Sequence, residues 1–412
     1  MKAAWIVWTF AIAALLSVCR PASADGLSDA AKSAAVDANR FAVDLYGQLG
    51  AADGKNLVFS PYSIDTALAM TSAGARGRTA QQMAGALHLE LPQDKLAEAM
   101  ANLSGSLHPP TIAGEALPFE LVTANALWVQ KGFAIVPGFI DVVKDRYGAE
   151  LDSLDFAGSV ESREAARSAI NDWVAKRTHD KIKGLIPPGS LDAATRLVLT
   201  NAIYFKSGWE APFEKGQTRD EPFHAGASAD EVPMMHQAHQ FGYFENEQLQ
   251  AAELPYRAGS LSMVVLLPKK PDGLGELEKS LTWKNLDTWL AGVAPHEVEL
   301  SLPKFTFTSH LGLAQTLRAM GMKDAFDADA DFSGISSSDR LYVQNVIHQA
   351  FIAVDESGTE AAAATSVTMG LMAMRMPSAP AIFEADHPFL FIIRDNGSGV
   401  ILFMGRVMNP KG

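Results

Sequence analysis

The sequence predicts an α+β fold, because strand-like and helix-like segments are mixed along its 412 residues. Continuous or alternating apolar runs at residues 261–268, 297–302 and 400–404 are typical of β-strands. Residues 161–177 and 309–322 have the hydrophobic spacing of α-helices. The composition is that of an ordinary globular protein, since 48% of the residues are hydrophobic and 20% are charged.

Residues 25–412 are expected to form one domain. We find no linker rich in proline, glycine or serine, no low-complexity tract and no internal repeat that would mark a boundary within them.

The first 24 residues have the features of a secretory signal peptide. Lys2 precedes an apolar stretch, and residues 22–24 (Ala-Ser-Ala) form a small-residue cleavage site. The apolar stretch of about 16 residues is shorter than the roughly 20 residues of a membrane-spanning helix, so we expect no membrane contact after signal removal. Cys19 raises the alternative of a lipoprotein, but Val18 is too bulky for the position before a lipidated cysteine. We therefore expect a secreted or periplasmic protein.

Cysteine count, charge and motif content argue against several functional classes. Cys19 is the only cysteine, so the processed chain is expected to have no disulfide, no thiol catalysis and no cysteine-bound metal. The net charge of −13 argues against a nucleic-acid partner. His296-Glu297 does not continue as a zinc-protease motif, residues 50–56 lack phosphate-loop spacing, and residues 397–399 are typical of a hairpin turn. We therefore expect no enzyme activity, no cofactor and no metal.

Residues 356–365, with the sequence Glu-Ser-Gly-Thr-Glu-Ala-Ala-Ala-Ala-Thr, are the most informative segment of the chain. After Gly358 they contain no large side chain, no proline and no further glycine, so they fit a packed sheet without a steric clash. Alanine nevertheless prefers helix and offers little apolar area to a sheet, so the run has little tendency to form a strand by itself. The segment is typical of a loop that becomes a strand only after some event.

The residues from Val354 to Thr365 resemble the hinge of the reactive-centre loop in serpins, the suicide inhibitors of serine proteases. Three further blocks are similar to the family and follow its order, at residues 56–79, 200–213 and 386–407. They contain Asn-Leu-Val-Phe-Ser-Pro-Tyr-Ser-Ile, Thr-Asn-Ala-Ile-Tyr-Phe-Lys-Ser-Gly-Trp and Asp-His-Pro-Phe-Leu-Phe-Ile-Ile-Arg, respectively. The resemblance covers about residues 35–410, and it implies three β-sheets, about nine α-helices and an exposed reactive-centre loop at about residues 356–381.

For the function, the resemblance implies that the chain traps a serine protease as a covalent acyl-enzyme. The cleaved hinge would then insert into the main sheet as a new strand. Strand alternation would turn the small, uncharged side chains of Thr359, Ala361, Ala363 and Thr365 to the buried side. The full set of expected hinge residues is Glu356, Gly358, Thr359, Glu360, Ala361, Ala362, Ala363, Ala364 and Thr365. The alternative is a serpin fold used for storage, transport or chaperoning.

Two interpretations of the cleaved bond are open. Counting Glu356 as residue 17 before the bond, the usual spacing of the family, places Met372 before the cut and Ala373 after it. Met372 would fit the apolar pocket of an elastase-, chymotrypsin- or subtilisin-like protease. The stretch that follows is a few residues longer than in typical members, so the alternative is Arg375, followed by Met376, with a trypsin-like target. Leu371 and Met374 are weaker candidates.

Several further positions match residues that control the opening of the sheet in serpins. Trp209 would lie at the top of the main sheet, where insertion begins, and Lys304 would pair with Glu356 at the base of the hinge. An ordinary core or surface role is the alternative for each position. A hinge strand beside an openable sheet also implies a monomer that can polymerise by loop insertion between molecules. Four polar residues would brace the opening point of the sheet, namely Ser60, Ser63, Asn201 and His348.

Overall fold

The computed structural model describes residues 26–50, 54–107, 119–226, 228–337, 340–359 and 379–411. The predicted signal peptide at residues 1–24 and the hinge residues from Glu360 to Thr365 lie outside the described residues. The same holds for the candidate cleavage positions Met372, Ala373, Arg375 and Met376.

The described residues combine helices and strands, so the α+β prediction is confirmed. They form nine α-helices, namely α1 Asp29–Gly50, α2 Pro61–Ser72, α3 Gly77–Ala86, α4 Gln93–Leu107, α5 Pro137–Asp141, α6 Val160–Arg177, α7 Leu274–Ser280, α8 Trp283–Ala291 and α9 Ala314–Ala319. The strands are β1 Leu57–Phe59, β2 Phe119–Gln130, β3 Glu150–Leu154, β4 Leu197–Gly208, β5 Arg219–Ala225, β6 Ser228–Glu245, β7 Leu249–Pro255, β8 Leu261–Pro268, β9 Ala294–Pro303, β10 Phe305–Gly312, β11 Val343–Asp355, β12 Gly358–Thr359, β13 Ala381–Glu384, β14 Phe389–Asp395 and β15 Ile401–Val407.

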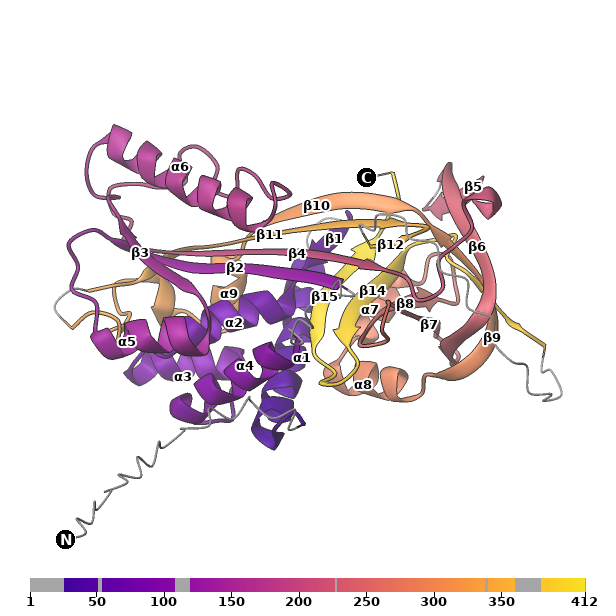
Figure 1. Ribbon diagram of the computed structural model, residues 1–412, viewed down its shortest axis with the longest axis horizontal. Helices are drawn as coiled ribbons and strands as arrows, with labels where there is room; N and C mark the ends of the chain where they lie inside the picture. The colour runs from indigo at the N-terminus through magenta and orange to yellow at the C-terminus, as the bar shows by residue number, and fades with distance from the viewer. Residues whose placement is uncertain are drawn as a thin grey trace, which may run out of the picture.

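A six-stranded sheet with the order β10-β11-β12-β4-β2-β3 carries the candidate site. Helix α6 lies on one face of this sheet, whereas α2, α9 and neighbouring helices lie on the other (Figure 1). Because both faces are covered, β4 is buried along its length except for the half-buried Lys206. This explains why the apolar residues of β4, at 197–199 and 202–205, form two continuous runs rather than an alternating pattern.

The remaining strands form one nine-stranded network with the order β1-β15-β14-β8-β7-β6-β9-β13, in which β5 also pairs with β6. Strand β6 is 18 residues long, and it pairs with β5 at its start, with β9 along its middle and with β7 at its end. This strand therefore joins the two smaller of the three implied sheets, so that they are continuous with each other through hydrogen bonds.

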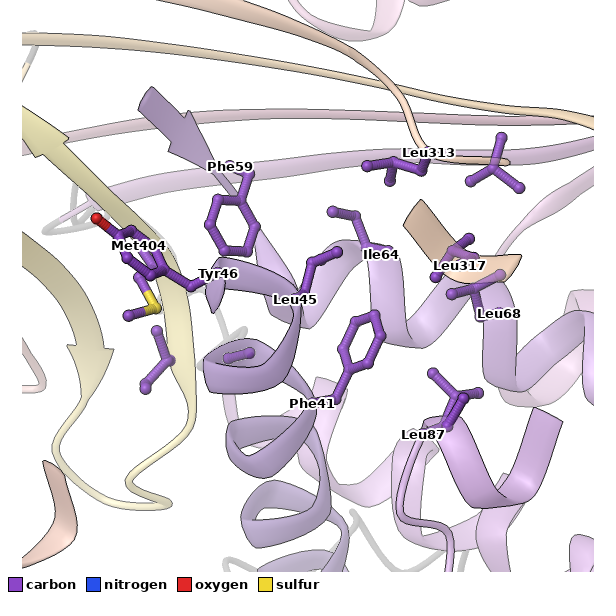
Figure 2. Close-up of a cluster of buried hydrophobic side chains, with 14 of the residues drawn as sticks. Phe41, Leu45, Tyr46, Phe59, Ile64, Leu68, Leu87, Leu313, Leu317 and Met404 are labelled. Carbon is purple, nitrogen blue, oxygen red and sulfur yellow. The ribbon is translucent and has the colours of Figure 1, made fainter. Parts of the chain in front are cut away.

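Helix α2 is the central element of the core, because all 12 of its residues are buried. Its N-terminus is fixed locally, since the Ser60 side chain caps the helix by accepting a hydrogen bond from the Ser63 amide, with Pro61 at the first helical position. Phe41 and Leu45 of α1 lie beside Ile64 of α2 in the same apolar cluster (Figure 2). Burying each such side chain contributes about 1.5–3 kcal/mol, which holds α2 firmly beneath the six-stranded sheet.

The helix predicted at residues 309–322 is wrong in its first part. Residues up to Gly312 belong to β10, which pairs antiparallel with β11 from Phe305↔Val354 to Gly312↔Ile347. Helix formation begins only at Ala314, because the long-range pairing overrides the local helical spacing. The other predicted segments are confirmed, since 161–177 lies in α6 and the three apolar runs correspond to β8, β9 and β15. Residues 397–399 lie in the connection between the antiparallel strands β14 and β15, as predicted.

Candidate functional site

The candidate site is the place where β4 and β11 part. The two strands run parallel and are paired from Leu197↔Val343 to Ile203↔Ala350. Beyond this point the short strand β12 lies between them and is antiparallel to both. Thr359 of β12 pairs with Ser207 on one side and with Val354 on the other. Gly358 and Thr359 of the predicted hinge therefore already lie inside the sheet. The expectation of an exposed loop from about residue 356 is wrong for residues 356–359, because Glu356, Gly358 and Thr359 are buried.

Gly358 makes the turn into this position possible. Its φ of +150° is a backbone conformation that other residues rarely adopt. A Cβ atom at this residue would lie 2.1 Å from the carbonyl oxygen of Ser207, so only glycine fits against β4. The Asp355 side chain supports the turn, because its Oδ1 accepts hydrogen bonds from the amides of Ser357 (2.7 Å) and Gly358 (3.3 Å).

Thr359 is held at the top of the sheet by an aromatic pair. It is 2% exposed, and its Oγ1 lies 2.6 Å from the hydroxyl of Tyr256. The Tyr256 ring stacks on Trp209 with 4.6 Å between ring centroids. Trp209 donates from its indole Nε1 to the carbonyl of Asp355 (2.9 Å), and its amide donates to the carbonyl of Ser357 (2.9 Å). Trp209 thus lies against the residues that lead into β12, and its role at the start of insertion stays a prediction.

Glu356 is only 5% exposed, and Lys304, Thr218 and the Phe213 amide hold it in place. The Lys304 ammonium lies 2.9 Å and 3.1 Å from its two carboxylate oxygens, and the Thr218 hydroxyl donates to Oε1 at 2.9 Å. The predicted contact between Lys304 and Glu356 is therefore present. Burial acts to raise the pKa of Glu356, but hydrogen bonds from Lys304, its own amide and Thr218 outweigh it and hold this pKa below its ordinary value. In addition, the Phe213 amide donates to the Glu356 carbonyl (2.9 Å).

A buried polar cluster joins β4, β11, β2 and α2 below the opening point; we call Ser60, Ser63, Asn125, Asn201 and His348 the switch cluster. Asn201 and His348 are direct neighbours across the parallel strands. The Asn201 amide nitrogen donates to the carbonyl (2.7 Å) and the hydroxyl (2.6 Å) of Ser63. The Asn201 carbonyl oxygen contacts Nδ1 of His348, and the Ser60 amide donates to Nε2 of the same ring at 3.0 Å. The four polar residues predicted from the sequence therefore lie together.

These contacts define the charge state of His348. The ring accepts at Nε2, so the proton is on Nδ1, where the Asn201 carbonyl accepts it. Burial lowers the pKa of His348 to about 3, with the nearby His310 adding to this effect and the contact to Asn201 opposing it. The switch cluster is therefore neutral at physiological pH, and its hydrogen bonds join two strands without any ion pair.

Three residues of the site were missed by sequence reasoning. Asn125 pairs directly with Asn201 across β2 and β4, and its Oδ1 accepts from Ser63 (3.2 Å) and from Asn201. A polar residue inside the apolar run of β2 was the available signal for it. Tyr256 and Thr218 carried no local signal, since only the fold brings them to Thr359 and Glu356.

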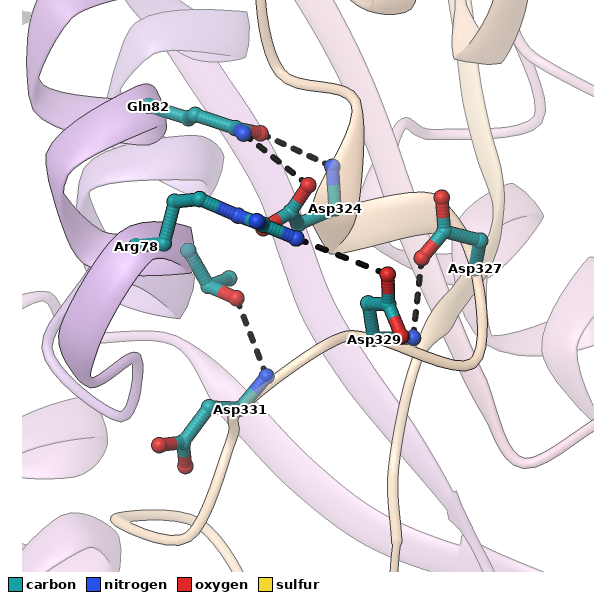
Figure 3. Close-up of polar contacts among 7 residues, drawn as sticks. Arg78, Gln82, Asp324, Asp327, Asp329 and Asp331 are labelled. Atoms are coloured by element: carbon teal, nitrogen blue, oxygen red, sulfur yellow. Dashed lines mark hydrogen bonds and ion pairs between the residues drawn. The ribbon is translucent and has the colours of Figure 1, made fainter.

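Asp324, Asp327, Asp329 and Asp331 lie close together in the sequence, and within the described residues Asp324 and Asp329 contact polar side chains of α3. Figure 3 shows Arg78 and Gln82 of α3 reaching the loop, where Gln82 donates to Asp324 (2.9 Å) and Arg78 contacts Asp324 and Asp329. Across the described ranges, no group of three or more His, Cys, Asp or Glu side chains is arranged to hold a metal ion. None of the helices in these ranges is long and apolar enough to cross a membrane.

Comparison with known proteins agrees with this geometry. The sequence model of the family Serpin (serine protease inhibitor) matches residues 37–410. An uncharacterized serpin-like protein of Thermococcus kodakarensis is 45% identical over 376 residues, which cover 90% of this chain and 85% of that protein. The leukocyte elastase inhibitor of Sus scrofa is 39% identical over 381 residues, covering 90% and 98% of the two chains.

A solved structure of human thyroxine-binding globulin complexed with thyroxine superposes with a TM-score of 0.83 at 30% identity, covering 93% of this chain and 100% of that one. Family match, relatives and fold coincide over most of the sequence, and the chain belongs to the serpin family.

Proposed function

We propose that this protein is a suicide inhibitor of serine proteases that traps the acyl-enzyme by inserting its cleaved loop between β4 and β11. The observation that carries the proposal is the position of β12, which is already antiparallel to both strands at the point where their direct pairing ends. A protease serine would attack a loop carbonyl, and the freed segment would extend β12.

The register of β12 supports this path. If the strand continued, each further loop residue would move one position back along both β4 and β11. Ala361 would then lie between Phe205 and Ile352, which are 2% and 1% exposed, and Thr365 would lie between Asn201 and His348. Small, uncharged side chains suit these buried rows. Insertion would thus separate the two strands at the switch cluster.

Insertion would form two antiparallel ladders in place of one parallel ladder, so the inserted state gains hydrogen bonds. The native state is therefore proposed to be kinetically trapped. About 14 inserted residues at roughly 3.3 Å each would carry an attached protease by about 46 Å, which would distort its active site before hydrolysis.

For the target, we propose cleavage after Met372 by an elastase-, chymotrypsin- or subtilisin-like protease, with Arg375 and a trypsin-like protease as the alternative. The similarity to a leukocyte elastase inhibitor supports an apolar pocket in the target. Secretion also remains a proposal, because residues 1–24 lie outside the part that the family model matches. We further propose that the processed protein is a monomer that polymerises by loop insertion when the sheet opens.

The test is to mix the processed protein separately with trypsin, chymotrypsin, pancreatic elastase and subtilisin. Denaturing gels would detect a covalent complex, and mass spectrometry would identify the released peptide. A complex that survives boiling, with a peptide that begins at Ala373, would support both trapping and the Met372 assignment. A peptide beginning at Met376 would move the assignment to Arg375. Clean cleavage without any complex would instead support a non-inhibitory serpin.

A further inference from the structure

Asp65 is a buried carboxyl group on the face of α2 that the proposed mechanism does not use. It is 1% exposed, and its Oδ1 has no hydrogen-bond partner. One helical turn further along α2, Ala69 belongs to an apolar cluster with Ala34 of α1 and with Leu96 and Met100 of α4. A carboxylate in such a place loses its hydration and gains no compensating hydrogen bond at Oδ1.

The charged groups around Asp65 would not compensate the negative charge of its ionised carboxylate. The charged group that acts on it is Asp37 of α1, which is itself only 2% exposed and has the same sign. The other titratable groups near it are the phenols of Tyr62 on α2 and Tyr147 after α5. The charged residues of α4, at positions 94, 95 and 98, are exposed. Within the described residues, no cation acts on Asp65.

Asp37 differs from Asp65, because it has partners. Arg40 lies one turn along α1 at 3.7 Å, and the amide of Glu90 donates to Asp37 at 3.4 Å. Burial raises the pKa of Asp37, and the charge of Glu90 adds to this effect, whereas the Glu90 amide, Arg40 and His88 act to lower this pKa. The rise is smaller than that for Asp65, whose pKa lies well above its ordinary value. Of the two buried acids, Asp37 is thus the better placed to carry the negative charge, and Asp65 the better placed to keep its proton.

We propose that Asp65 is a neutral carboxylic acid in the native protein and that its ionisation sets an alkaline limit to the native state. Burial first, and then the charge of Asp37, raise the pKa of Asp65 well above its ordinary value, which agrees with this geometry. In the unfolded chain an aspartate loses its proton near pH 3.9, whereas the native chain keeps it to a higher pH. The Asp65 contribution to stability is therefore present at low pH and is lost as the pH rises toward the native pKa.

The position of Asp65 links this limit to the opening of the sheet. Asp65 lies two residues after Ser63, whose hydroxyl and carbonyl brace Asn201 of β4. A charge buried between α1 and α2 would push these helices apart and shift the N-terminal turn of α2, including Ser60 and Ser63. At high pH the native protein would then convert or polymerise faster; this consequence rests on the proposed function, whereas the stability effect does not.

The test compares the native protein with Asp65→Asn, which mimics the protonated carboxyl but does not titrate. Guanidinium unfolding followed by tryptophan fluorescence would be measured at several pH values between about 5 and 9. The stability of Asp65→Asn relative to the parent is expected to rise with pH, by up to tenfold in the unfolding equilibrium or rate constant per pH unit, until the native carboxyl ionises. The control Asp287→Asn, at an exposed position on α8, should show a constant difference. Parallel pH profiles for Asp65→Asn and the parent would overturn the proposal.

A second measurement keeps the proposal testable if Asp65→Asn fails to fold. Infrared spectra of the native protein, labelled with ¹³C at the aspartate carboxyl groups, should contain the band of a protonated carboxyl at pH 7. The Asp37→Asn variant removes the like charge, so this band should disappear at a lower pH than in the parent. Absence of a protonated aspartate at pH 7 would refute the proposal. Neither experiment uses a protease, so a failure of protease trapping leaves their outcome unchanged.

Discussion

Replacing Thr359 with arginine should convert the proposed inhibitor into a substrate. Thr359 is 2% exposed, and its hydroxyl lies 2.6 Å from that of Tyr256. Tyr256 is itself fully buried and stacked on Trp209, so the position has no space for a guanidinium group. Because Thr359 already lies in the sheet of the native protein, the arginine is expected to displace β12 from that sheet. Residue 359 must then re-enter the sheet before the rest of the cleaved loop can follow, so its charge acts on the first step of insertion.

The size of the effect follows from the burial of the site. An uncompensated buried charge costs about 3–5 kcal/mol, and the lower end applies because an arginine can partly reach solvent at the end of the sheet. If the insertion barrier rises by about 3 kcal/mol, insertion slows roughly 150-fold. Hydrolysis of the acyl-enzyme is unaffected by this change, so it should overtake insertion and release the protease.

The assay is a titration of a fixed amount of target protease, read as the moles of inhibitor needed for complete inhibition. Thr359→Arg should raise this ratio many-fold, with cleaved inhibitor replacing the covalent complex on gels. The matched control is Thr359→Ser, which keeps the hydroxyl near Tyr256 and should behave like the parent. A Thr359→Arg protein that still traps the protease at the parental ratio would refute the proposed insertion path.

Three further predictions concern the switch cluster and the hinge. The pKa of a histidine is about 6.5 in an unfolded chain, whereas that of native His348 is about 3. The free energy of unfolding should therefore fall as the pH drops below 6.5, by about 3 kcal/mol at pH 4.5. The guanidinium midpoint of His348→Gln should not show this fall between pH 6.5 and 4.5. Lys304→Met leaves the buried Glu356 without its cation and should cost about 1–2 kcal/mol, since Lys304 is partly exposed; a thermal midpoint equal to that of the parent would contradict this. Gly358→Ala places a Cβ 2.1 Å from the Ser207 carbonyl oxygen and should displace β12 at a cost of about 1–3 kcal/mol, so the Thr359 amide should exchange its hydrogen faster.

The sequence predicts best what is local. The apolar runs of β8 and β15 and the helical spacing of α6 depend on neighbouring residues, and each element lies where its sequence pattern indicates. The residues that sequence reasoning missed depend on long-range pairing. Asn125 contacts Asn201, which is 76 residues further along the sequence, and the hydrophobic pattern of β2 does not predict which residue Asn125 contacts. The strand at residues 309–312 was mistaken for helix for the same reason, since only its pairing with β11 decides its conformation.

The composition of the switch cluster explains how a sheet can be both closed and ready to open. Its contacts are hydrogen bonds between neutral groups, each worth about 1 kcal/mol net, so separating β4 from β11 requires no buried ion pair to break. Under the proposed function, Thr365 would insert between Asn201 and His348 and form backbone hydrogen bonds with both β4 and β11. The free energy spent in separating these two strands would therefore be recovered once insertion is complete. A charge on either side of α2 would upset this balance, through His348 at low pH and through Asp65 at high pH. The free energy of unfolding of the double variant, His348→Gln with Asp65→Asn, should therefore vary less with pH than that of either single variant, at both ends of the pH range. A double variant whose profile is no flatter than those of the single variants would show that the two groups do not limit the same state.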